Sequence, residues 1–194
     1  MTRAESLNGR VTGIVIGTSA GGVEALSILL PALPVRLAAA VFVVLHVPRG
    51  RPSLLVEIFK EKCALPVREA EDKELVQPGT VYFAPPDYHL LIEDGPRVAL
   101  SVDEPVHHSR PSIDVLFESA ADVYRERLMG IILTGANEDG ADGLAKVHSA
   151  GGVTVVQKPE EALEARMIRS ALRRCAADFV VPLQRIAAIL GSLA

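Results

Sequence analysis

Three polar side chains have the types and positions that nucleophilic catalysis requires. Ser19 lies in Gly17-Thr-Ser-Ala-Gly21, which matches the G-x-S-x-G turn that exposes a serine between a strand and a helix. His46 ends a second apolar segment, and an imidazole is the commonest base for taking a serine proton. An acidic turn at residues 138–142 could supply a carboxylate to orient that imidazole. Together these are the parts of a Ser-His-acid triad.

Each feature also has a purely structural interpretation. The turn at residues 17–22 resembles a degraded dinucleotide-binding fingerprint, although that motif needs a glycine where Ser19 stands and an acid at the end of the second strand. A histidine at the end of a strand is often an ordinary structural residue. The carboxylates of Glu138, Asp139 and Asp142 would each cap a helix, and spacing alone does not choose among them.

Apolar runs and helical patterns alternate along the chain, and this order indicates how the candidates are positioned. We expect strands at residues 11–16, 41–46, 131–133 and 153–156, and hairpin strands at 80–84, 89–92 and 98–102. Helices are expected at 23–33, 52–62, 112–124, 160–174 and 182–193, and a further helix follows residue 140 and ends at about residue 149. The predicted fold class is therefore α/β: a three-layer, doubly wound, mostly parallel sheet with an appended antiparallel hairpin. Each candidate directly follows a strand, so the three should share the carboxyl edge of the sheet.

Composition excludes several other classes. The 194 residues predict a single domain over residues 1–194, with residues 1–10 flexible. A net charge of −4 offers no basic surface to nucleic acid, and the amino terminus lacks the apolar region of a secretion signal. The longest apolar run, at residues 37–45, is about half the length of a membrane helix. We expect a cytoplasmic protein with no nucleic-acid partner and no membrane insertion.

No metal or cofactor is expected. His107 and His108 are adjacent, and on a strand they would point to opposite faces. The other two histidines outside the triad lack partners at ligand spacing, and the two cysteines form no ligand motif. Arg110 could either bind a substrate carboxylate or pair with Asp114.

Five spaced blocks make the sequence similar to the catalytic domain of the chemotaxis protein-glutamate methylesterases. The blocks are Ile16-Gly-Thr-Ser-Ala-Gly-Gly22, Leu45-His-Val-Pro48, Glu69-Ala-Glu-Asp72, Arg110-Pro-Ser-Ile-Asp-Val-Leu-Phe117, and Ile131-Ile-Leu-Thr-Gly135 with Asp139-Gly140. They follow the family order over nearly the whole chain. The resemblance implies a serine hydrolase that removes methyl esters from receptor glutamates and also deamidates receptor glutamines.

The resemblance also implies residue roles. Ser19 becomes the nucleophile, His46 the base and Asp139 the orienting acid, while the backbone N–H groups of Ala20 and Ala136 form the oxyanion hole. Arg110 and Met167 are the expected substrate contacts. The implied partner is a methylated chemoreceptor or a similar helical signalling protein. Because 194 residues leave no room for the family's amino-terminal receiver domain, we expect either an unregulated esterase or one that a fused domain or a separate receiver or kinase partner controls.

The chain departs from the family pattern close to the candidate site. Ala136 and Asn137 replace a Met and a Gly in the loop before the aspartate, Ser109 replaces a His, and residues 157–168 lose their small, apolar character. These departures motivate an alternative hypothesis, a catalytically impaired binding or regulatory module that keeps the fold. Nucleotide binding at the glycine turn is a third.

Overall fold

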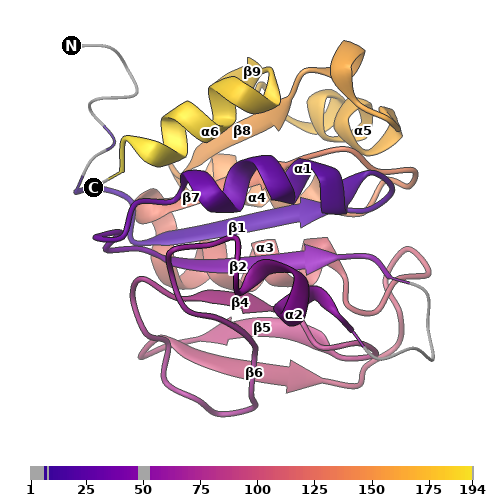
Figure 1. Ribbon diagram of the computed structural model, residues 1–194. Coiled ribbons are helices and arrows are strands. Elements are labelled where there is room, and N and C mark those ends of the chain that lie inside the picture. Colours follow the sequence, from indigo (N-terminus) through magenta and orange to yellow (C-terminus); the bar gives the residue numbers. More distant parts are fainter. Residues whose placement is uncertain (1–6, 8, 48–52, 194) are drawn as a thin grey trace.

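A seven-stranded parallel sheet forms the centre of the computed structural model, which describes residues 7, 9–47 and 53–193 (Figure 1). Its order is β3–β4–β2–β1–β7–β8–β9. These strands are β1 Gly13–Thr18, β2 Ala40–Leu45, β3 Val67–Glu69, β4 Val81–Phe83, β7 Leu128–Ile132, β8 Val153–Gln157 and β9 Phe179–Val181. A separate antiparallel pair consists of β5 His89–Glu93 and β6 Arg97–Ser101. The predicted α/β class is confirmed.

Helices cover both faces of the sheet and complete a three-layer arrangement (Figure 1). One face packs against α1 Gly22–Leu29, α2 Leu55–Phe59 and α6 Leu183–Gly191; the other packs against α3 Ile113–Tyr124, α4 Ala141–Ser149, α5 Arg166–Arg174 and the β5–β6 pair. Because side chains alternate along a strand, Ile14 and Ile16 of β1 enter the first core and Val15 enters the second. Within the described residues, no helix is long and apolar enough to cross a bilayer.

Some predicted elements were wrong. The helix expected at 160–174 begins only at Arg166, because the preceding residues bond to the loop after β7: Glu164 N–H donates to Thr134 Oγ1 at 3.0 Å and Glu164 O accepts from Gly135 N–H at 2.9 Å. The piece expected at 80–84 in a hairpin is instead β4, which pairs in parallel with β2. The sequence reading missed β3 and β9, which have only three residues each.

Two expectations concern residues that the structure largely leaves undescribed. The expected flexibility of residues 1–10 falls mainly on them, and so does the expected helix start at Pro52. Within the described part, α2 is limited to Leu55–Phe59. The expectation of one domain over residues 1–194 stays a prediction.

Candidate active site

The carboxyl ends of three neighbouring strands bring the candidate residues together. β1 lies between β2 and β7, and the pairing continues beyond the strand ends: His46 N–H donates to Thr18 O at 3.1 Å, and Ser19 N–H donates to Thr134 O at 3.0 Å. Ser19 is therefore flanked by the loop that starts with His46 and by the loop that leads to Asp139. The backbone ladder, rather than a contact between loop tips, places the three side chains at one edge.

A buried carboxylate anchors this edge. Asp139 Oδ2 lies 2.8 Å from His46 Nε2, and the Asp139 side chain is fully buried while that of His46 is 12% exposed. Asp139 also accepts from Ser112 Oγ at 2.8 Å, Ile113 N–H at 2.7 Å and Asp114 N–H at 3.0 Å. These donors belong to the first turn of α3, where free N–H groups and the helix dipole stabilise an anion. The helix start thus holds the carboxylate that orients the imidazole.

The charge of Asp139 determines which imidazole nitrogen is basic. Burial raises the pKa of the Asp139 carboxyl, but the hydrogen bond and charge of His46 and the backbone N–H groups of α3 outweigh it, so the pKa lies below its usual value. An ionised carboxylate can only accept hydrogen bonds, so Nε2 of His46 carries the hydrogen that faces it. The neutral ring then has its lone pair at Nδ1, the nitrogen available to take a proton.

Asp114 lies beside this anion without opposing it. The pKa of the Asp114 carboxyl is raised to about 7, because burial and the charge of Asp139 raise it by more than the Gly143 N–H lowers it. Below pH 7 this side chain is mostly protonated, and a second negative charge next to Asp139 is avoided. Its Oδ1 accepts from Gly143 N–H at 2.7 Å, which joins α3 to α4.

The hydroxyl of the nucleophile candidate and the N–H groups of the two oxyanion donors have no hydrogen-bond partner among the residues that the structure describes. Ser19 is partly buried, and its hydroxyl makes no hydrogen bond with any residue in the described ranges. The N–H groups of Ala20 and Ala136 likewise have no acceptor within that part of the chain. Two threonines join the loops that carry them, since Thr18 Oγ1 donates to Thr134 O at 2.9 Å and Thr134 Oγ1 donates to Ala20 O at 2.8 Å. Such N–H groups are available to a developing oxyanion.

The two expected substrate contacts have other roles in the structure. Arg110 does not pair with Asp114; its Nη1 donates to the carbonyl oxygens of Val102 at 2.7 Å and Asp103 at 3.1 Å. Met167 is fully buried and lies against Gly135, where an added Cβ would come within 2.5 Å of the Met167 Cε. Met167 therefore packs against the loop that carries Ala136 and supports it from the protein interior.

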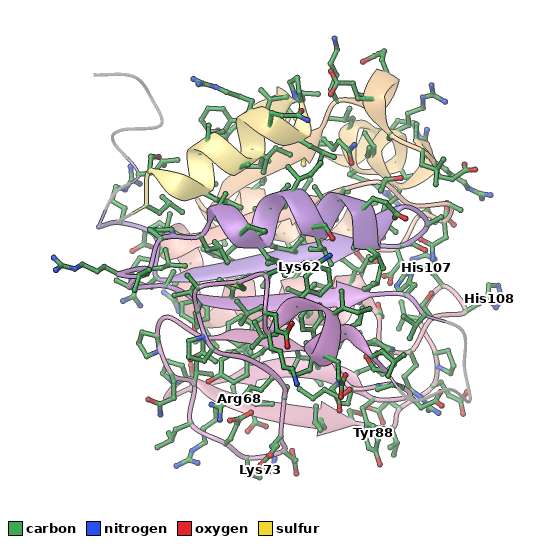
Figure 2. The ribbon with its side chains drawn as sticks, in the orientation of Figure 1. Lys62, Arg68, Lys73, Tyr88, His107 and His108 are labelled. Atoms are coloured by element: carbon green, nitrogen blue, oxygen red, sulfur yellow. The ribbon has the colours of Figure 1, made fainter. Side chains whose placement is uncertain are left out.

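One cluster outside the triad consists of residue types that can bind a metal ion. His107 and His108 form the tip of a tight turn, with φ of 47° and 63°. Figure 2 shows both beyond the carboxyl ends of the strands. His107, Asp114 and Asp142 each place one ligand atom within 4.8 Å of the others. Asp142 is already paired with Arg174 at 2.9 Å. His107, Asp142 and Arg174 also line a pocket of about 370 Å³.

Sequence reasoning missed two residues of the site. Ser112 was expected to cap α3, which it does by accepting from Val115 N–H at 3.4 Å, but its donation to Asp139 was not foreseen. Asn137 was noted only as a departure in a loop, whereas its Nδ2 lies 3.3 Å from His46 Nδ1. The position of each residue in the sequence could have indicated its role, since each stands within or next to one of the blocks that carry the family resemblance.

Gly140 fixes the backbone directly after Asp139, and replacing it should destabilise the protein. Its φ is +95°, and an added Cβ would lie 2.7 Å from both Ile113 Cγ2 and Ile132 Cδ1. We expect Gly140→Ala to lower the free energy of unfolding by about 3 kcal/mol, from left-handed strain and overpacking. Gly95→Ala is the matched control: φ is +81° with nothing within 4 Å, so strain alone should cost about 1 kcal/mol. Equal losses in urea unfolding would contradict the close packing.

The fold and site together define a class: a doubly wound α/β protein with a serine, a histidine and an aspartate at the carboxyl edge of its sheet. The sequence model of the CheB methylesterase family matches residues 14–190. The chain therefore belongs to the CheB methylesterase family.

Named relatives agree with this assignment. A putative protein-glutamate methylesterase/protein-glutamine glutaminase of Leptospira interrogans serogroup Icterohaemorrhagiae serovar copenhageni is 47% identical over 174 residues, which is 90% of each chain. The protein-glutamate methylesterase/protein-glutamine glutaminase of Symbiobacterium thermophilum is 41% identical over 90% of this chain but 48% of its own length. The crystal structure of the Thermotoga maritima CheB methylesterase catalytic domain matches with a TM-score of 0.90 and 34% identity, covering 95% of this chain and 99% of that one.

Proposed function

We propose that this protein is a protein-glutamate methylesterase that hydrolyses methyl esters on glutamate side chains of a chemoreceptor. The observation that carries the proposal is the 2.8 Å bond from His46 to the buried Asp139, at the strand end that adjoins Ser19. Membership of the CheB methylesterase family supports the reaction, and the names of the relatives support the substrate class.

The proposed reaction begins with acyl transfer to Ser19. Its Oγ attacks the ester carbonyl while Nδ1 of His46 takes the hydroxyl proton, and Asp139 stabilises the resulting imidazolium through Nε2. The N–H groups of Ala20 and Ala136 receive the negative oxygen of the tetrahedral intermediate. The ester C–O bond then breaks, and methanol leaves with the proton from His46.

Hydrolysis of the acyl-enzyme repeats these roles with water. Nδ1 of His46 takes a proton from water, whose oxygen attacks the acyl carbon, and the serine leaves with that proton. The products are the receptor glutamate and free Ser19. An amide is an acyl compound of the same geometry, so deamidation of receptor glutamines, with ammonia as the leaving group, is part of the proposal; the relatives' names support it.

The proposal also includes the setting of the reaction. The substrate is a methylated helical region of a receptor, which a cytoplasmic enzyme could reach, and the control comes from a separate receiver or kinase partner. The Symbiobacterium relative is about twice as long as the part that this chain matches. A regulatory partner would be expected to alter methanol release when it is added to the purified protein.

Methanol release from a methylated receptor tests this function. The protein should release methanol from receptor fragments that carry glutamyl methyl esters and none from the unmethylated fragments. A fluorophosphonate, which modifies activated serines, should stop the release and add one adduct to the tryptic peptide that contains Ser19. The fluorophosphonate-treated protein serves as the matched control.

Two outcomes would contradict the proposal. Methanol release that survives full modification would exclude Ser19 as the nucleophile. A protein that binds the methylated fragment but neither releases methanol nor reacts with fluorophosphonate would instead be the catalytically impaired module.

A further inference from the structure

We propose that Asn137 is a positioning residue that occupies the basic nitrogen of His46 in the resting site and must withdraw before Ser19 can be activated. This inference rests on the proposed role of His46 as the base. It concerns the contact between Asn137 Nδ2 and His46 Nδ1, which lie 3.3 Å apart.

The orientation of the Asn137 amide follows from its neighbours. Asp139 N–H, which can only donate, lies 3.3 Å from Oδ1 of Asn137. The other end of the amide, the Nδ2 group, therefore faces His46 Nδ1 at 3.3 Å and Ser109 Oγ at 3.2 Å. Ser109 Oγ donates in turn to His107 O at 3.5 Å, which leaves its lone pairs for Asn137. All these donors and acceptors match only when Nδ2 points at the imidazole.

This contact uses the lone pair that catalysis needs. His46 Nε2 donates to Asp139, so Nδ1 of the neutral ring is an acceptor and receives the hydrogen from Asn137 Nδ2. A ring nitrogen has one in-plane lone pair, so it cannot bond the amide and the Ser19 hydroxyl equally well. In keeping with this, the Ser19 hydroxyl has no partner among the described residues.

The contact also becomes unfavourable when the reaction proceeds. Once Nδ1 of His46 holds the serine proton, it faces the N–H of Asn137 donor to donor, and the amide must move away. Ser109 Oγ offers an acceptor that keeps one Nδ2 hydrogen bonded during that movement. Ser109 and Asn137 contact each other directly, beside the imidazole of His46. We infer that they act as a pair, with Asn137 as the gate and Ser109 as its support.

Four variants distinguish the effect of the Asn137 side-chain amide from the effect of the backbone at this position. Asn137→Gly and Asn137→Ala both remove the amide, and only the first adds backbone freedom. Asn137→Asp keeps the shape but replaces the donor with an acceptor, and Ser109→Ala removes the support. The measurement is the second-order rate of fluorophosphonate labelling of Ser19 across the pH range, with the 15N resonances of His46 as a spectroscopic check and thermal unfolding as a check on folding.

The expected results differ in direction. Asn137→Gly and Asn137→Ala should label Ser19 about fivefold faster, the factor that corresponds to one ordinary hydrogen bond. Ser109→Ala should label more slowly than the wild type. Asn137→Asp should label more slowly at neutral pH, with the acid limb of its rate profile at higher pH, because a carboxylate favours the imidazolium. In the wild type, neutral His46 should be the Nε2–H tautomer, and its Nδ1 resonance should shift in Asn137→Ala.

Other results would overturn the proposal that Asn137 competes with Ser19 for His46. If Asn137→Ala labels at the wild-type rate or below, with an unchanged pH profile and Nδ1 resonance, the amide does not compete for the base. An increase in Asn137→Gly alone would assign the effect to the backbone and would equally overturn it. Absence of labelling in every protein, the wild type included, would instead remove Ser19 as the nucleophile and so contradict the proposed function itself.

Discussion

Replacing Ser19 with alanine should lower kcat for methanol release by about 10⁶-fold, and removing His46 as well should cost almost nothing more. The reason is that the base has no proton to take when the nucleophile is absent. Parallel measurements on Ser19→Ala, His46→Ala and the double variant test this. Ser27, whose hydroxyl accepts from Lys62 Nζ at 3.4 Å, provides the matched control, and Ser27→Ala should retain its activity within about twofold.

The comparison among the three variants is more informative than any one loss. If the losses multiply in the double variant, the two residues act independently and the acyl-transfer mechanism is wrong. If His46→Ala alone remains active, another group takes the proton. The oxyanion hole and substrate binding should leave about 10³-fold residual catalysis over water in all of them.

The second large effect is expected for Asp139→Asn, which should lower kcat by about 10⁴-fold. An amide at this position has one acceptor, whereas the carboxylate serves four donors: Ser112 Oγ, His46 Nε2 and the N–H groups of Ile113 and Asp114. With the amide nitrogen facing it, His46 would adopt the Nδ1–H tautomer and lose its basic lone pair at that nitrogen. Thermal unfolding should also show a destabilised protein.

Asp142→Asn provides the matched control for this variant. Asp142 lies three residues further along the chain than Asp139, in the first turn of α4; it is half exposed and pairs with Arg174 at 2.9 Å, so its neutralisation should change kcat less than about twofold. A loss at Asp142 as large as that at Asp139 would indicate that the charge of the turn matters rather than the specific contact with His46. Retained activity in Asp139→Asn would exclude the orienting role.

The sequence predicts that the three candidates share one edge of the sheet because strands and strand ends are strongly encoded. The wholly buried segments of β1 and β2 read as apolar runs, and each ends immediately before a polar candidate. Once these runs are parallel neighbours, their carboxyl ends must meet. Spacing could not choose Asp139 over Glu138 and Asp142. In the structure, its burial against the first turn of α3 distinguishes it from both.

The failures share a physical cause: contacts that are distant in sequence. Residues 160–165 have helical spacing, but the backbone of Glu164 bonds to Thr134 and Gly135, which are about 30 residues away in sequence. The contact between Asn137 and His46 spans 91 residues, and no local pattern announces such a pairing.

The bonds from α3 to Asp139 have a consequence for how this protein can lose function. The carboxylate that orients the imidazole is also the group that satisfies the first N–H groups of α3, so catalytic competence and the integrity of that helix start are a single local equilibrium. Fraying of the first turn of α3 would release Asp139 from His46 and so inactivate the proposed site, although the sheet would remain intact. Amide hydrogen exchange at Ile113 would therefore report the fraction of molecules whose active site is assembled, without any substrate present.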